Sequence, residues 1–87
     1  MEGYRLCFTP LGKESLAKLD KSVAQDILKK LRWLSDNADG VMHLPLKGSF
    51  KGLYKLRVGP WRVIYQIDRE DRAVVVHLVG HRREIYG

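Results

Sequence analysis

Cysteine is nearly absent from the sequence, and long apolar runs are absent altogether. The single cysteine, Cys7, cannot form an internal disulfide, which favours a reducing, cytoplasmic setting. Cys7 lies in a short apolar run, so we interpret it as a small core residue rather than a nucleophile. No run approaches the ~20 apolar residues that span a bilayer, and the first residues lack the apolar stretch of a secretory signal. We therefore expect a cytoplasmic protein without a membrane segment.

Acidic residues are scarce in the second half of the chain. The 87 residues carry a formal net charge of +6. Residues 1–43 hold seven Lys/Arg against six Asp/Glu, whereas residues 44–87 hold nine against four. Such an excess of cations favours a polyanionic partner, either nucleic acid, a membrane surface or an acidic protein. Length and composition (45% hydrophobic, 30% charged) predict one globular domain over residues 1–87.

The first half of the chain predicts a strand followed by two helices. Tyr4–Thr9 is aromatic and apolar, which is typical of a strand. Pro10–Leu19 begins with a proline suited to a first helical turn. A second helix is expected from about residue 21 to residue 37, with Asp20 or Ser22 as its N-cap. The connection between the helices is short, which favours an antiparallel hairpin. The second helix has one apolar stripe, made of Val23, Ile27, Leu31 and Leu34.

The second half predicts a loop and then a meander of strands. Residues 41–52 contain one proline and two glycines and are expected to be a loop, with a short extended piece at 44–46. Three strands and a polar, basic tail at residues 80–87 follow. The predicted strands are Leu53–Val58, Trp61–Asp68 and Ala73–Val79. The order predicts an α+β domain, with the helical hairpin on one face of an antiparallel meander. The other face is then solvated or binds a partner.

Strand alternation predicts that this second face is basic. Alternate residues of a strand point to the same face, and one such set is apolar and suited to the helices. The opposite set comprises Lys55, Arg57, Arg62, Gln66, His77 and His81. A two-residue turn at Gly59-Pro60 would place Arg57 directly opposite Arg62. Two like charges so placed are destabilising, whereas a phosphate between them would accept parallel hydrogen bonds from both. The alternative is that both long side chains simply extend into water.

The basic tail and the histidines add possible chemistry to this face. We do not expect His77 and His81 to bind a metal, because the sequence has no second cysteine and no carboxylate cluster near them. No cofactor is expected. Cations beside a phenol are suited to a reaction in which a ribose 2′-hydroxyl attacks its own phosphate. The negative charge of the pentacovalent phosphate must be stabilised. A base must take the proton of the 2′-hydroxyl, and an acid must give one to the leaving 5′-oxygen. Neighbouring cations lower the pKa of a lysine or phenol, so Lys55 or Tyr86 could be the base.

Three segments resemble the RelE/ParE superfamily of bacterial and archaeal toxins. They are residues 44–48 (Leu-Pro-Leu-Lys-Gly), residues 52–65 (from Gly-Leu-Tyr-Lys-Leu-Arg-Val-Gly to Trp-Arg-Val-Ile-Tyr), and residues 80–86 (Gly-His-Arg-Arg-Glu-Ile-Tyr). The order strand, helix, helix and meander is similar as well, so the resemblance covers nearly the whole chain. It implies a RelE-like fold.

The resemblance also implies a function and a set of site residues. RelE-like members are ribosome-dependent messenger-RNA endonucleases of type II toxin–antitoxin systems, and a cognate antitoxin inhibits them. Carried over by motif, the catalytic residues are Lys55, Arg57, Arg62, Arg82 and Tyr86, with Arg83 as the alternative to Arg82. Further RNA contacts are expected from Lys47, Lys51, His81 and Arg83. Two other hypotheses remain: a ParE-like poison of DNA gyrase, and a module that binds RNA or antitoxin without catalysis.

Overall fold

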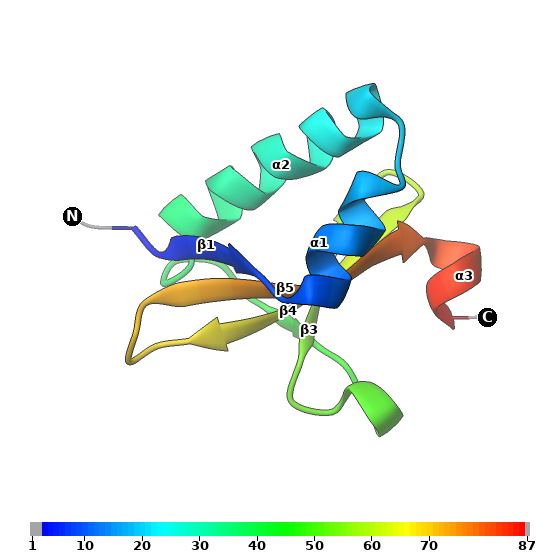
Figure 1. Cartoon of the computed structure of the whole chain (residues 1–87). Coiled ribbons are helices and arrows are strands. Elements are labelled where there is room, and N and C mark those ends of the chain that lie inside the picture. Colours follow the sequence, from blue (N-terminus) through cyan, green and yellow to red (C-terminus); the bar gives the residue numbers. More distant parts are fainter. Residues whose placement is uncertain (1–2, 87) are drawn as a thin grey trace.

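Two helices cover one face of a five-stranded sheet, and a third, short helix packs at its end (Figure 1). The computed structural model describes residues 3–86, and the side chains of residues 3–85. The elements are β1 (Arg5–Phe8), α1 (Pro10–Ala17), α2 (Lys21–Asp36), β2 (Leu44–Pro45), the 3-10 turn η1 (Gly48–Phe50), β3 (Tyr54–Val58), β4 (Trp61–Asp68), β5 (Ala73–His81) and α3 (Arg82–Tyr86). The α+β fold class predicted from the sequence is confirmed.

The sheet has the strand order β1-β5-β4-β3-β2. β3, β4 and β5 form the predicted antiparallel meander, and β2 adds an antiparallel edge strand of only two residues. β1 pairs parallel with β5 and forms the other edge. In Figure 1, α1 and α2 lie above the sheet and η1 lies below it. One face of the sheet therefore faces the two long helices and the other does not.

Local sequence explains how α1 begins and how closely it packs. Thr9 precedes the helix, and its hydroxyl oxygen accepts a hydrogen bond from the Gly12 N–H at 3.0 Å. Pro10 occupies the first turn, where its missing N–H costs nothing. A Cβ on Gly12 would lie 2.2 Å from the Val76 carbonyl oxygen, so only glycine lets α1 approach β5 this closely. Asp20 is the N-cap residue of α2, but the expected capping bond from its side chain is not formed.

The core lies between α2 and the sheet. The predicted stripe of α2 is buried, since Ile27 and Leu31 are 0% exposed and Leu34 is 2% exposed. The sheet contributes Val63, Tyr65, Val74, Val76 and Val79. The interpretation of Cys7 as a core residue is wrong. Leu6 and Phe8 of β1 pack against the core, so Cys7, between them, points to the opposite face of the sheet, where it is half-buried.

A register shift between β4 and β5 changes which side chains share a face. Ile64 pairs with Leu78 and Tyr65 with Val76, so His77 is the extra residue of a bulge. Beyond it the alternation of β5 is inverted relative to a regular strand. Val79, expected on the basic face, is buried in the core. Its N–H, which points to the helix side, donates to the Ser15 hydroxyl oxygen of α1 at 2.9 Å.

The C-terminal segment is more ordered than a polar tail. β5 continues two residues beyond its predicted end, to His81, and the next five residues form the short helix α3. The predicted loop over residues 41–52 contains β2, as expected, and the 3-10 turn η1, which was not expected. Among the described residues, no helix combines the length and the apolar character that crossing a membrane requires.

Candidate functional site

Two arginines face each other where β3 and β4 meet their connecting turn. Arg57 pairs with Arg62 in the register of the two strands, as predicted from the Gly59-Pro60 turn. Arg62 pairs on its other side with Gly80 of β5. The three residues form a row across the sheet, on the face away from α1 and α2. We call Arg57 and Arg62 the arginine pair.

The two arginines differ in environment. Arg57 is exposed, whereas Arg62 is only 4% exposed. One terminal nitrogen of the Arg62 guanidinium donates to the Gly59 carbonyl at 2.8 Å and to the Trp61 carbonyl at 2.9 Å. The alternative in which both arginines extend into water is therefore wrong for Arg62, because its side chain folds back against its own turn.

The C-terminal segment flanks the arginine pair. The sequence predicts a polar, basic tail at this position, whereas the segment forms the helix α3. The Arg82 N–H donates to the Pro60 carbonyl at 2.9 Å and fixes the start of α3 beside the β3–β4 turn. The Ile85 side chain lies 3.3 Å from the position that a Cβ of Gly80 would occupy. Gly80 thus leaves space for Ile85 next to Arg62. A glycine inside a β-branched strand was the available signal for such a close approach.

The other predicted site residues are distributed around this row. Lys55 points to the same face two residues before Arg57, and it is half-buried. Arg82 and Arg83 are exposed on α3. Tyr86 ends α3, but its side chain lies outside the described residues. Two exposed lysines, Lys47 and Lys51, flank η1 in the loop between β2 and β3.

Three predicted members of the basic face are not brought to the arginine pair. His81 pairs with Trp61, and the two rings pack edge to face with centroids 5.4 Å apart. Because of the bulge, His81 shares a face with Trp61, which packs against the core, and not with Arg62 on the opposite face. Its predicted place on the basic face is therefore wrong. His77 and Gln66 do share a face and interact at 3.1 Å, but they lie farther along the strands.

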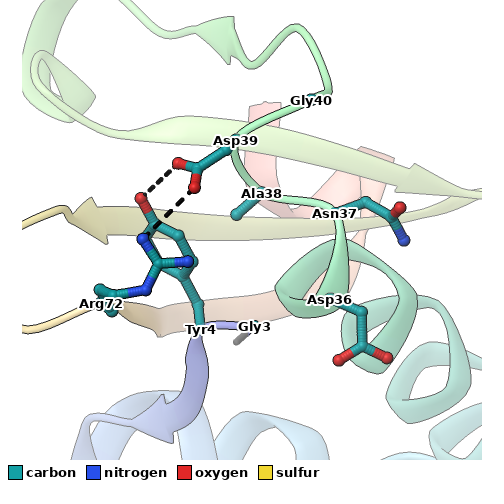
Figure 2. A pocket seen from close by; sticks show the side chains of 8 residues that line it. All are labelled: Gly3, Tyr4, Asp36, Asn37, Ala38, Asp39, Gly40 and Arg72. Atoms are coloured by element: carbon teal, nitrogen blue, oxygen red, sulfur yellow. Dashed lines mark hydrogen bonds and ion pairs between the residues drawn. The ribbon is translucent and has the colours of Figure 1, made fainter. Parts of the chain in front are cut away.

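A second polar cluster lies at the other end of the sheet (Figure 2). Tyr4 and Arg72 both point to Asp39: the Tyr4 hydroxyl donates to one carboxylate oxygen at 2.7 Å and Arg72 to the other at 3.3 Å. The Arg72 guanidinium also lies 4.5 Å from the centre of the Tyr4 ring. This cluster borders a cavity of 170 Å³. β5 separates it from Gly80 by roughly 25 Å, at ~3.3 Å per residue.

The carboxylate of Asp39 is balanced by the two arginines beside it, Arg69 and Arg72. The hydrogen bond from Tyr4, followed by the charges of Arg72 and Arg69, lowers the pKa of Asp39. The same hydrogen bond is the main reason that the pKa of Tyr4 is raised. The cluster joins β1, the end of α2 and the β4–β5 turn, so we interpret it as structural. The arginine pair differs, because none of the ion pairs among the described side chains involves Arg57 or Arg62.

A histidine and two tyrosines pack between the loop after α2 and the sheet. His43 lies 2.6 Å from the Tyr65 hydroxyl and 2.8 Å from the Ala38 carbonyl, and its ring contacts Tyr54. Burial, with a smaller contribution from Tyr54, raises the pKa of Tyr65 to about 12. Tyr65 is 1% exposed, so this phenol is a core group. Within the described part of the chain, no three His, Cys, Asp or Glu side chains are grouped to hold a metal ion.

Comparison with known proteins places the chain among the toxins of type II toxin–antitoxin systems. Residues 6–86 match the family described as the ParE toxin of the type II toxin–antitoxin system parDE. The chain is 40% identical over 83 residues to Toxin RelG of Mycobacterium tuberculosis, and the alignment covers 95% of each chain.

Solved structures agree with this assignment. The toxin–antitoxin complex RelBE2 of M. tuberculosis contains a chain with a TM-score of 0.81 and 30% identity, with 94% of each chain covered. A mutant of Escherichia coli toxin RelE in the free state matches with a TM-score of 0.78 and 26% identity, over 98% of this chain and 92% of that one. The chain therefore belongs to the RelE/ParE family of type II toxin–antitoxin toxins.

Proposed function

We propose that the chain is a ribosome-dependent endoribonuclease that cleaves messenger RNA in the cytoplasm and that a cognate antitoxin inhibits. The arginine pair carries the proposal: Arg57 and Arg62 lie opposite each other, and Arg62 is buried without a carboxylate among the described ion pairs. The likeness to RelG and to RelE structures supports the nuclease class. The RelBE2 complex supports an antitoxin as partner.

The charge balance of the arginine pair favours an anionic ligand. A buried charge without a counter-ion costs several kcal/mol, and the two carbonyl bonds of Arg62 offset only part of this cost. A phosphate beside Arg57 would be attracted by both guanidiniums and would relieve their mutual repulsion. In this proposal Arg57 and Lys55 contact the phosphate, while Arg62 supplies a fixed positive charge beneath it.

The reaction that fits these groups is an internal transfer at phosphorus. The ribose 2′-oxygen bonds to the adjacent phosphorus and loses its proton to a base, and the 5′-oxygen leaves and takes up a proton. The products are a 2′,3′-cyclic phosphate and a 5′-hydroxyl end. Lys55, Arg57, Arg62 and one arginine of α3, Arg82 or Arg83, would stabilise the pentacovalent charge.

The remaining site residues have proposed roles in proton transfer and RNA binding. Tyr86 or Lys55 would take the proton from the 2′-oxygen. Further RNA contacts come from Lys47 and Lys51 beside η1. His81 and Arg83, on the Trp61 side of the sheet and on α3, would contact RNA outside the cleavage point. The ribosome would orient the message, because a site with so few acid–base groups gains most from positioning.

Growth arrest on expression tests the site. Arg57→Ala changes an exposed side chain, so it should relieve the arrest without altering the fold, and Tyr86→Ala should do the same. Arg62→Ala would also disturb a buried network, so Arg62→Lys is the better substitution there. Arg32→Ala, at an exposed arginine of α2, is the matched control and should remain toxic. The proposed site is wrong if Arg57→Ala and Tyr86→Ala remain fully toxic.

A gyrase poison is the second candidate, and one observation favours it. The matching family is described by the ParE toxin of parDE. Under this alternative, expression would induce DNA damage before it blocks translation, and messages would stay intact. The time order of the two effects after induction separates the candidates. A module that only binds RNA would show steep salt dependence of binding with neither effect.

A further inference from the structure

Helix α3 is too short to be stable on its own. It spans five residues, Arg82–Tyr86, whereas isolated helices shorter than about 12–15 residues are marginal in water. The N–H groups of its first turn also have no acceptor within the helix. Contacts with the rest of the chain must therefore hold α3 in its helical form, and three such contacts are present among the described residues.

Two of these contacts fix where α3 begins and which side of the sheet it reaches. The Arg82 N–H donates to the Pro60 carbonyl at 2.9 Å. This carbonyl belongs to the β3–β4 turn, against which the Arg62 guanidinium also folds. Ile85 lies beside Gly80, on the Arg62 face of the sheet. The start of α3 and the buried arginine therefore depend on one turn.

The third contact comes from His81, the residue directly before α3. Its ring atom Nδ1 accepts a hydrogen bond from the Arg83 N–H at 3.2 Å. His81 thus acts as an N-cap residue, since a side-chain acceptor at that position bonds the N–H of the second or third helical residue. The bond requires an unprotonated Nδ1, so the proton of the neutral ring lies on Nε2. The Trp61 ring packs edge to face against this imidazole, which restricts its rotation.

A helical α3 brings two of the proposed site residues together. Arg82 and Tyr86 are four residues apart, and in a helix such residues are neighbours with Cβ atoms ~5–6 Å apart. In an extended chain the same four residues span roughly 13 Å, at ~3.3 Å per residue. Unwinding of α3 would therefore move Tyr86 away from Arg82.

We propose that His81 is a positioning residue of the nuclease site: its Nδ1 caps α3 and thereby keeps Arg82 and Tyr86 together beside the arginine pair. The inference rests on the proposed function for the roles of Arg82 and Tyr86. The cap is distinct from the RNA contact considered above, because the cap uses Nδ1 whereas a contact with a phosphate oxygen would use the Nε2–H. The imidazole takes no part in the proton transfers of the reaction.

Three substitutions of His81 separate these tasks. His81→Asn keeps an acceptor near the position of Nδ1, His81→Gln places its polar atoms near the position of Nε2, and His81→Phe keeps a ring against Trp61 without an acceptor. We expect His81→Phe to lower the maximal rate of message cleavage more than about fivefold, the effect of a lost cap. The ribosome concentration that gives half this rate should stay within about twofold.

Two further variants complete the cleavage experiment. His81→Asn should restore the maximal rate to within about twofold of the unsubstituted chain, because it restores the cap, whereas His81→Gln should not. His77→Phe makes the same change at a histidine of β5 that interacts with Gln66, away from α3. It is the matched control, and its maximal rate should also stay within about twofold.

Nuclear magnetic resonance tests the cap without RNA. In neutral His81 the ring proton should lie on Nε2, and the carbon shifts of residues 83–86 should lose helical character in His81→Phe but keep it in His81→Asn. The proposal is overturned if the proton lies on Nδ1, if α3 stays helical in His81→Phe, or if His81→Gln restores cleavage and His81→Asn does not. A chain with a capped α3 that cleaves no message would overturn the proposed function and leave the cap in place.

Discussion

Replacing Arg57 by glutamine should stabilise the fold while impairing the proposed activity. Arg57 and Arg62 are directly opposed on neighbouring strands, and no described ion pair offsets their charges. Cross-strand pairs of this kind contribute roughly 0.2–1 kcal/mol. The free energy of unfolding of Arg57→Gln should therefore rise by that amount. For a domain of this size, the melting temperature should rise by roughly 1–6 °C.

Thermal unfolding followed by circular dichroism at low and high salt measures this effect. The difference between Arg57→Gln and the unsubstituted chain should shrink at about 1 M salt, where the Debye length is about 3 Å. Arg32→Gln, at an exposed arginine of α2, should change the melting temperature by less. If Arg57→Gln melts at the same or a lower temperature at low salt, the two arginines do not repel each other and the argument for an anion between them fails.

Three further predictions concern the fold. Gly12→Ala should lower the free energy of unfolding by about 1–3 kcal/mol in urea, because its Cβ would collide with the Val76 carbonyl oxygen. The pKa of Tyr65 is raised from 10.0 to about 12, so stability present below pH 10 should be lost as the pH rises through 12, by about 3 kcal/mol; Tyr65→Phe should remove this dependence. The pKa of Asp39 lies below its ordinary 3.8, so its stabilisation should be lost as the pH falls through that lowered pKa, and Asp39→Asn should flatten the acid limb of the unfolding curve.

The elements of the fold were predictable where one periodicity dominates. The stripe from Ile27 to Leu34 identified α2 and its buried face, and alternation with a two-residue turn placed Arg57 opposite Arg62. In each case, local spacing alone determines which side chains are neighbours. The register of the meander near the turn follows from the turn itself, so it could be read from the sequence.

The site could not be predicted where distant segments determine the environment. The bulge at His77 depends on pairing between β4 and β5 and on Ser15 of α1, which accepts the N–H of Val79. Strict alternation therefore placed His81 on the wrong face. The burial of Arg62 depends on the turn carbonyls and on the packing around it, which strand alternation does not encode. Cys7 was misplaced because its short apolar run shows no alternation of polar and apolar residues, so the sequence does not indicate which of its side chains face the core.

Cleavage of messenger RNA in a purified translation system tests the central claim most directly. Primer extension on a translated message should show new 5′ ends within the coding sequence when the chain is added, and the upstream fragments should end in 2′,3′-cyclic phosphates. Arg57→Ala should abolish these ends, while Arg32→Ala should leave them. An intact message in the presence of a folded chain that still arrests growth and produces DNA breaks would contradict the account.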